Sequence, residues 1–123
     1  MIADIDGLTE DDNGNPAIIE IKCVSEYKRS EWDNDQIPQY YLTQVMHYLA
    51  VTGLDTAYVC ALIGGNSMII REVHADEEMI AMLIACEKDF WQKVTGLIYH
   101  HDIMNPVNLY KHLNHLLLVL SFQ

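Results

Sequence analysis

The sequence has few basic residues, and this shortage limits the classes of function. Lysine and arginine together number 7, against 18 aspartates and glutamates, so the formal net charge is −11. Non-specific affinity for nucleic acid comes from cations that neutralise phosphates, so this balance argues against a general electrostatic nucleic-acid-binding protein. It does not exclude an enzyme that uses divalent cations, because acidic side chains attract such ions.

The sequence also has few cysteines and no long hydrophobic run. Cys23, Cys60 and Cys86 are odd in number and far apart, so they fit neither a disulfide framework nor a zinc or iron–sulfur spacing. We expect reduced core cysteines in a cytoplasmic protein. The sequence contains no run of about 18 apolar residues, so we expect no membrane span. The first residues have neither the basic nor the apolar region of a signal peptide.

Half of the 123 residues are hydrophobic, which is sufficient for the core of one domain. We expect an α/β (α+β) fold with a mixed sheet flanked by helices over residues 1–95, and a tail of unassigned role, largely helical, over 96–123. Alternation and apolar runs predict strands at residues 2–8, 17–24, 56–63 and 68–73, and helical spacing predicts helices at 39–52 and 76–94.

Turn residues separate these elements. Asn13-Gly14 is a strong hairpin signal between the first two strands. The polar segment 25–38 predicts an irregular connection that is long enough to be functional or mobile. We expect its Trp32 to pin it to the core rather than to stack on a base. Arg71 and Glu72 are expected to be exposed charges on an edge strand.

The stretch 17–24 contains the candidate site. Alternate side chains of a strand share a face, so Glu20 and Lys22 point the same way, and the hairpin brings Asp6 near Glu20. Paired carboxylates suit Mg²⁺, and a neighbouring lysine can orient or deprotonate a water, which together suit phosphodiester hydrolysis. On these residues alone, an ordinary surface ion pair between Glu20 and Lys22 is the simpler interpretation. Gln44, on the 39–52 helix, lies on a stripe that we expect to face this pair.

Three ordered blocks resemble one known family. They are Ile5-Asp6-Gly7-Leu8, then Ile19-Glu20-Ile21-Lys22-Cys23, then the block from Ile37 to Tyr48 that reads Ile-Pro-Gln-Tyr-Tyr-Leu-Thr-Gln-Val-Met-His-Tyr. In this order they closely resemble the YqaJ-like viral recombinase (lambda exonuclease) family of restriction-endonuclease-like PD-(D/E)xK nucleases. The resemblance covers roughly residues 2–94 and implies a restriction-endonuclease-like core.

The resemblance also implies roles for individual residues. Asp6 and Glu20 would be metal ligands, with the backbone carbonyl of Ile21 as a third. Lys22 would be the catalytic lysine. Gln44 and Tyr40 correspond to the Tyr-x-x-Gln block, in which the glutamine positions water or the lysine. Tyr40 is accordingly the expected DNA-binding residue.

The implied activity is hydrolysis of duplex DNA with Mg²⁺, or Mn²⁺ in its place, in phage-type recombination. The implied partners are double-stranded DNA, a single-strand annealing protein and further copies of the chain, in the cytoplasm of a bacterial host, with no membrane. Family members carry helices before the Asp-Gly strand, so we expect the N-terminal part of the core to be missing here. The alternatives are a non-catalytic remnant that acts as a structural or protein-binding module, and a structure-specific or restriction-type endonuclease.

Overall fold

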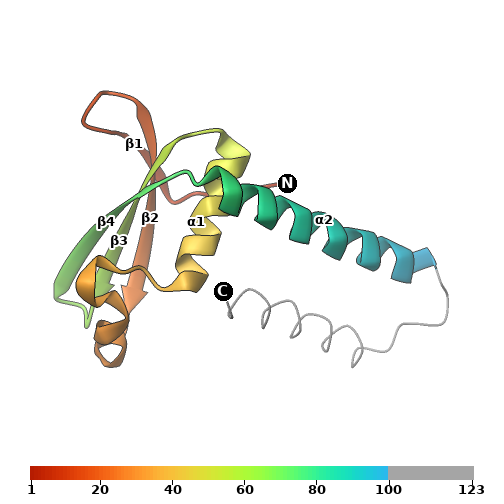
Figure 1. Cartoon of the computed structure of the whole chain (residues 1–123). Coiled ribbons are helices and arrows are strands. Elements are labelled where there is room, and N and C mark those ends of the chain that lie inside the picture. The colour runs from red at the N-terminus through yellow and green to blue at the C-terminus, as the bar shows by residue number, and fades with distance from the viewer. Residues whose placement is uncertain (100–123) are drawn as a thin grey trace. The chain divides into compact units, whose positions relative to one another are not determined.

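The computed structural model describes residues 1–99, which fall into two units: residues 1–81, and the described part of a second unit that begins at residue 82. A four-stranded sheet, one α-helix and one 3₁₀ segment form most of the first unit (Figure 1). In chain order the elements are β1 (Gly7–Glu10), β2 (Pro16–Val24), the 3₁₀ segment η1 (Glu26–Asp35), α1 (Gln39–Thr52), β3 (Thr56–Ile63), β4 (Ser67–His74) and α2 (Glu77–Tyr99).

The sheet is mixed, with the strand order β1-β2-β3-β4. The outer pairs β1–β2 and β3–β4 are antiparallel, and the central pair β2–β3 is parallel. Parallel neighbours need a long crossover, and the chain between β2 and β3 contains η1 and α1. The predicted α+β class and mixed sheet are therefore confirmed.

One face of the two central strands is closely packed. Ile18, Glu20 and Val24 of β2 pair with Ala57, Val59 and Ile63 of β3, and all six are buried. Val45, Met46 and Leu49 of α1 are buried as well, and α1 lies beside the sheet (Figure 1). The bounds of α1 and β3 are as predicted, and Gly53 ends α1 in the left-handed conformation with a φ of 70°.

The first strand was predicted at residues 2–8, but β1 begins at Gly7 and continues through Glu10. Its ladder cannot begin earlier, since the Asp6 carboxylate accepts the backbone N–H of Ile21 on β2. It continues further because the side chain of Asp11 accepts the N–H groups of Asn13 and Asn15 at 2.9 and 2.8 Å. The tight turn therefore lies at residues 11–15, around the predicted Asn-Gly signal.

The opposite face of β2 is open over its C-terminal half within the first unit. Ile21 is 57 % exposed on this face, and Cys23 is exposed as well. The prediction of core cysteines is therefore wrong for Cys23, because strand alternation places it opposite the packed face. Cys60 and Cys86 are partly buried, and burial raises the pKa of the Cys60 thiol.

The predicted irregular segment after β2 is helical. η1 is a 3₁₀-helical segment whose backbone is non-helical at Asp33 and Asn34. Trp32 is 1 % exposed, which confirms that it pins the segment to the core. Arg71 of β4 is not the exposed edge charge that we predicted. Its Nη2 donates to the backbone oxygen of Trp32 at 3.1 Å and lies 3.4 Å from the Asp35 carboxylate, because its side chain points to the face on which η1 lies.

α2 begins where the sequence predicts and ends later. The Asp76 carboxylate accepts the N–H of Met79 at 2.9 Å and so caps the helix. The helix continues to Tyr99, past the predicted end at residue 94. Within residues 1–99, no helix is both long and apolar enough to cross a membrane. The helix predicted within residues 96–123 lies mostly outside the described residues.

Candidate active site

β2 holds an acid and an amine side by side on its packed face. Glu20 is 3 % exposed, and its Oε1 lies 2.5 Å from Nζ of Lys22. The side chain of Lys22 is 14 % exposed, so both charges are largely removed from water. An ordinary surface ion pair would have neither charge buried, so that simpler interpretation of the sequence is wrong.

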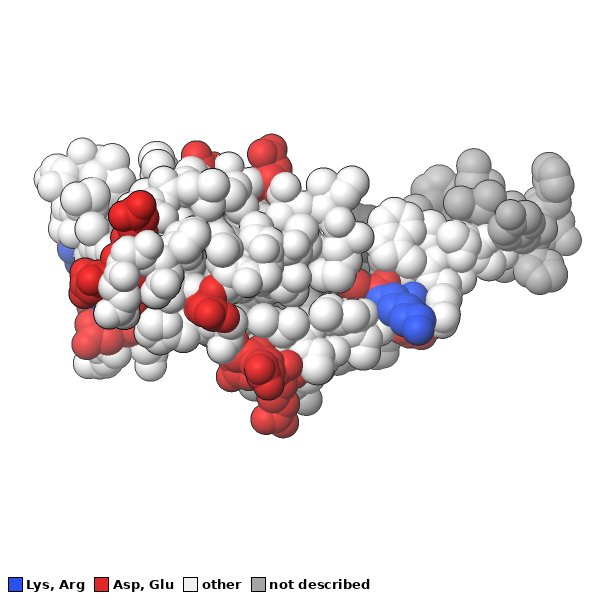
Figure 2. Space-filling model, turned by 90° about the horizontal axis from the view of Figure 1, so that it is seen from above, with Lys and Arg blue, Asp and Glu red and all other residues white. Residues whose placement is uncertain are grey.

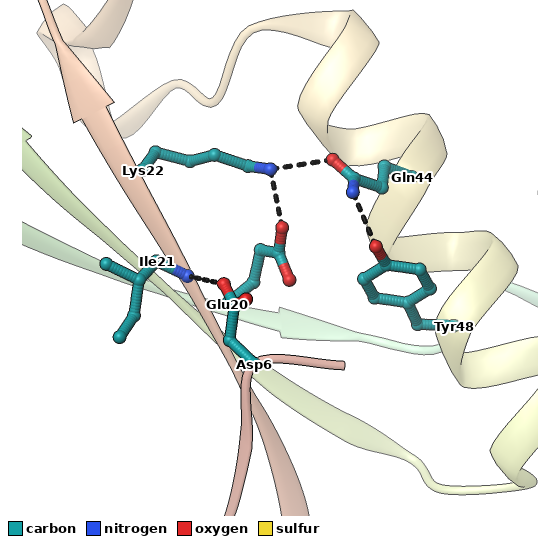
Figure 3. Close-up of polar contacts among 6 residues, drawn as sticks. All are labelled: Asp6, Glu20, Ile21, Lys22, Gln44 and Tyr48. Carbon is teal, nitrogen blue, oxygen red and sulfur yellow. Dashed lines mark hydrogen bonds and ion pairs between the residues drawn. The ribbon is translucent and has the colours of Figure 1, made fainter. Parts of the chain in front are cut away.

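α1 supplies the second set of contacts to Lys22. The ammonium donates to Oε1 of Gln44 at 2.7 Å and lies 4.8 Å from the ring centre of Tyr41. Nε2 of Gln44 in turn donates to the hydroxyl oxygen of Tyr48 at 2.5 Å. Figure 3 shows this chain of contacts from β2 to the helix. The amine is therefore fixed by a carboxylate, an amide and an aromatic ring.

Asp6 reaches the same region from the start of β1. Its Oδ2 accepts the N–H of Ile21 at 2.8 Å. Gly7 pairs with Ile19, so Asp6 lies level with Glu20 in the antiparallel register, in agreement with Figure 3. The N–H and C=O of one strand residue point to the same neighbouring strand. The carbonyl of Ile21 therefore faces the edge at which Asp6 lies.

These oxygens fit a hard divalent cation. Oε2 of Glu20 is buried and has no hydrogen-bond partner among the described residues, so one carboxylate oxygen lacks a compensating contact. Asp6 and the carbonyl of Ile21 supply further oxygen donors nearby. The described residues contain no group of three or more His, Cys, Asp or Glu side chains placed to hold a metal ion. The donor set matches Mg²⁺, which keeps several waters and takes only one or two protein carboxylates.

Tyr40 is the one predicted site residue that does not join this cluster. It lies one helical turn before Gln44, and its hydroxyl donates to Oε2 of Glu31 on η1 at 3.0 Å. Partial burial, and then the hydrogen bond to Glu31, raise the pKa of Tyr40 above its usual value. His47 of α1 has its Nε2 2.9 Å from the backbone oxygen of Ile2.

Sequence reasoning missed Tyr41 and Tyr48 as members of the site. Both belong to the apolar residues that recur at helical spacing along residues 39–52, and such a stripe predicts packing against the core. The structure shows both half-buried, with their polar or π-electron groups in contact with Lys22 and Gln44. The i,i+4 spacing of Gln44 and Tyr48 was an available signal, since such side chains are neighbours on a helix.

Comparisons with known proteins show the family of the chain. Residues 1–55, which contain Asp6, Glu20, Lys22 and Gln44, match the model of the YqaJ-like viral recombinase domain. The chain is 43 % identical over 86 residues to the uncharacterized protein YqaJ of Bacillus subtilis (strain 168), which covers 68 % of this chain and 27 % of that protein. The aligned stretch thus spans about a quarter of the relative's length.

Among solved structures, the fold is similar to the crystal structure of SSO0001. The TM-score is 0.48 at 20 % sequence identity, and the match covers 66 % of this chain and 37 % of that one. The family match rests on the sequence comparisons, and they confirm the resemblance that the three ordered blocks predict. The chain belongs to the YqaJ-like viral recombinase family and contains a match to that family's domain over residues 1–55.

Proposed function

We propose that the chain contains the site of a Mg²⁺-dependent deoxyribonuclease that hydrolyses phosphodiester bonds in duplex DNA during phage-type recombination. The observation that supports this most strongly is the buried Glu20. One of its oxygens bonds Lys22, and the other has no partner within residues 1–99. An unpaired buried carboxylate oxygen beside an exposed carboxylate, Asp6, is expected where a cation binds.

The residues of the chain divide the chemistry between them. Asp6, Glu20 and the carbonyl of Ile21 would hold Mg²⁺, and Mn²⁺ would replace it. When bound, the ion supplies Lewis-acid stabilisation of phosphate oxygens and an activated water. Asp6 is exposed and Glu20 is buried, so substrate would approach from the Asp6 side of the pair.

Lys22 would act on the water and on the phosphate. Its ammonium has three N–H donors, and the bonds to Glu20 and Gln44 use two of them. The third can donate to a phosphate oxygen or orient the attacking water. The Gln44–Tyr48 pair would fix the direction of that N–H, because Gln44 is itself held by a hydrogen bond.

The net charge of −11 is the main objection to a DNA enzyme. Figure 2 shows a face on which acidic side chains outnumber basic ones. The basic residues of the first unit are not dispersed, however. They are Lys22 at the site, Lys28 and Arg29 on η1, and Arg71, which bonds η1. A bound divalent cation would add positive charge at the same place, which favours a phosphate there over general binding along the duplex.

Cleavage of labelled DNA tests this proposal directly. Linear and covalently closed circular duplexes are incubated with the full chain and Mg²⁺. Release of nucleotides from the linear substrate alone indicates an exonuclease, and nicking of the circle indicates an endonuclease. At a temperature at which the variant is folded, Lys22→Met should lower the rate by about 10²–10⁴-fold, the usual contribution of a positioned acid or base. Lys88→Met removes an exposed lysine of α2 and is the matched control.

A metal-binding measurement separates a nuclease from a non-catalytic remnant. Calorimetry with Mn²⁺ should show binding that Glu20→Gln abolishes. Glu10→Gln, at an exposed position at the end of β1, should leave it unchanged. Wild-type chain that neither binds the ion nor cleaves either substrate would overturn the proposal and favour the structural or protein-binding module.

A further inference from the structure

We infer that η1 is a second DNA contact, at which Tyr27 stacks on an unpaired base and Lys28 binds an adjacent phosphate. This inference rests on the proposed nuclease function and specifies its substrate, a duplex end with unpaired nucleotides. It concerns residues that are outside the Asp6, Glu20 and Lys22 cluster.

The backbone of η1 is anchored from two sides. Trp32 is buried in the core, and Arg71 of β4 bonds its backbone oxygen. At the other end, the Arg29 guanidinium forms two bonds to the Glu26 carboxylate, at 2.5 and 2.9 Å, and lies 3.4 Å from the hydroxyl of Ser67. Tyr27 and Lys28 lie between Glu26 and Arg29, so the bonds between these two residues hold that turn of the backbone in place before any substrate binds.

Tyr27 has no packing role in this anchored segment. It is 98 % exposed, which is the highest value among the large hydrophobic side chains of the described residues. An aromatic ring held in water on a fixed backbone is a surface on which a base can stack, with little further loss of chain entropy. Stacking tolerates any base, because every base has a π-face.

Lys28 is exposed beside Tyr27 and is partly oriented. Its Nζ lies 5.6 Å from the ring centre of Tyr40, whose hydroxyl bonds Glu31 on the same segment. A cation held over an aromatic ring keeps its donors available to a phosphate. Tyr40 would thus serve DNA binding through Lys28, which accounts for its position outside the metal cluster.

The position of η1 suits the strand that is being cut. Lys22 and Ser25 are three residues apart along β2 and its exit, which corresponds to about 10 Å of extended chain. A few nucleotides of unpaired strand span this length, so η1 begins a few nucleotides from the phosphate that would lie at Lys22. Away from the terminal base pair, only an unpaired base can expose a face to Tyr27, so the contact predicts preference for a short single-stranded extension.

Fluorescence tests the stacking contact. A duplex with a four-nucleotide overhang carries 2-aminopurine at the second, third or fourth overhang position in turn, and Ca²⁺ replaces Mg²⁺ to prevent cleavage. Wild-type chain should quench the probe at one of these positions, because stacking on an aromatic ring quenches it. Tyr27→Ala should lose the quenching and bind the overhang about tenfold more weakly or worse. Tyr27→Phe should retain both.

The controls separate this inference from the proposed function. Trp91→Ala removes another exposed aromatic side chain and should change neither signal. Thermal unfolding should be the same for Tyr27→Ala and wild type. If the wild type cleaves DNA while Tyr27→Ala binds the overhang as tightly as the wild type, η1 is not a base contact and the nuclease proposal stands. If Tyr27→Ala weakens the binding of blunt duplexes as much as that of duplexes with an overhang, the stacking role of Tyr27 is wrong. A wild type that neither binds nor cleaves DNA overturns both.

Discussion

Replacement of Lys22 by methionine should destabilise the fold strongly, even though the residue belongs to the active site. Methionine keeps most of the length of the side chain and removes the charge. Glu20 then remains 97 % buried with neither oxygen facing a cation. Breaking a buried ion pair from one side typically costs about 3–5 kcal/mol, because the other charge is left uncompensated.

This loss of free energy of unfolding corresponds to a fall in the melting temperature. In a domain of this size, 1 kcal/mol shifts the midpoint by about 4–8 °C, so we expect a fall of about 12 °C or more. The double variant Lys22→Met with Glu20→Gln removes the stranded charge and should recover at least about half of the loss. Mg²⁺ should raise the midpoint of the single variant more than that of the double variant, because only the single variant retains the buried charge of Glu20 for the ion to compensate.

Circular dichroism during heating measures the melting temperature of each variant, and circular dichroism in urea measures its free energy of unfolding. Lys88→Met is again the control, since it removes an exposed charge. A loss below about 1 kcal/mol for Lys22→Met would match an exposed ion pair and would refute the argument from burial. An equal response of the single and double variants to Mg²⁺ would refute the assignment of Glu20 as a ligand.

Three further predictions concern other parts of the chain. Gln44→Ala should reduce cleavage about tenfold without abolishing it, because Lys22 keeps its bond to Glu20; equal rates would show that Gln44 does not orient the amine. Trp32→Ala should cost about 3–5 kcal/mol in urea unfolding, and a cost below about 1 kcal/mol would mean that η1 is not anchored by this ring. The pKa of Asp11 lies below its usual value because Asn15 donates hydrogen bonds to its carboxylate, so its stabilising contribution is complete above about pH 4 and is lost as pH falls through the lowered pKa. Nuclear magnetic resonance titration measures this pKa directly, and an unshifted value would contradict the turn geometry.

Local signals predicted the elements whose boundaries depend on local chemistry. Pro38 and Gly53 bracket α1, and both ends of β3 are as predicted, since a buried apolar run lies between polar turns. The hairpin signal at Asn13-Gly14 located the first turn. The predicted bounds of β1 were wrong because they depend on the side chains of Asp6 and Asp11. The backbone groups that these side chains bind cannot be predicted from strand alternation.

Contacts between distant segments were harder to predict. The sequence placed Glu20, Lys22 and Gln44 toward one another, and the structure brings them together. It did not place Arg71 against η1, because that contact requires the order of strands in the sheet. The aromatic contacts of Lys22 were missed because an apolar stripe on a helix predicts core packing and does not distinguish the edge of the core from its centre.

The alternation of β2 around the site has a consequence for how the strand finds its place during folding. Apolar Ile21 lies on the open face and charged Glu20 on the packed one, so a shift of one residue would bury the aliphatic chain and free the acid. At Glu20 and Ile21, burial would favour that wrong register, so the sequence is locally frustrated at the residues that would perform the chemistry. The turn held by Asp11, together with Ile18 and Val24 at either end, must select the productive alignment. Substitutions in the hairpin can therefore disable the site without touching it, by letting the strand slip.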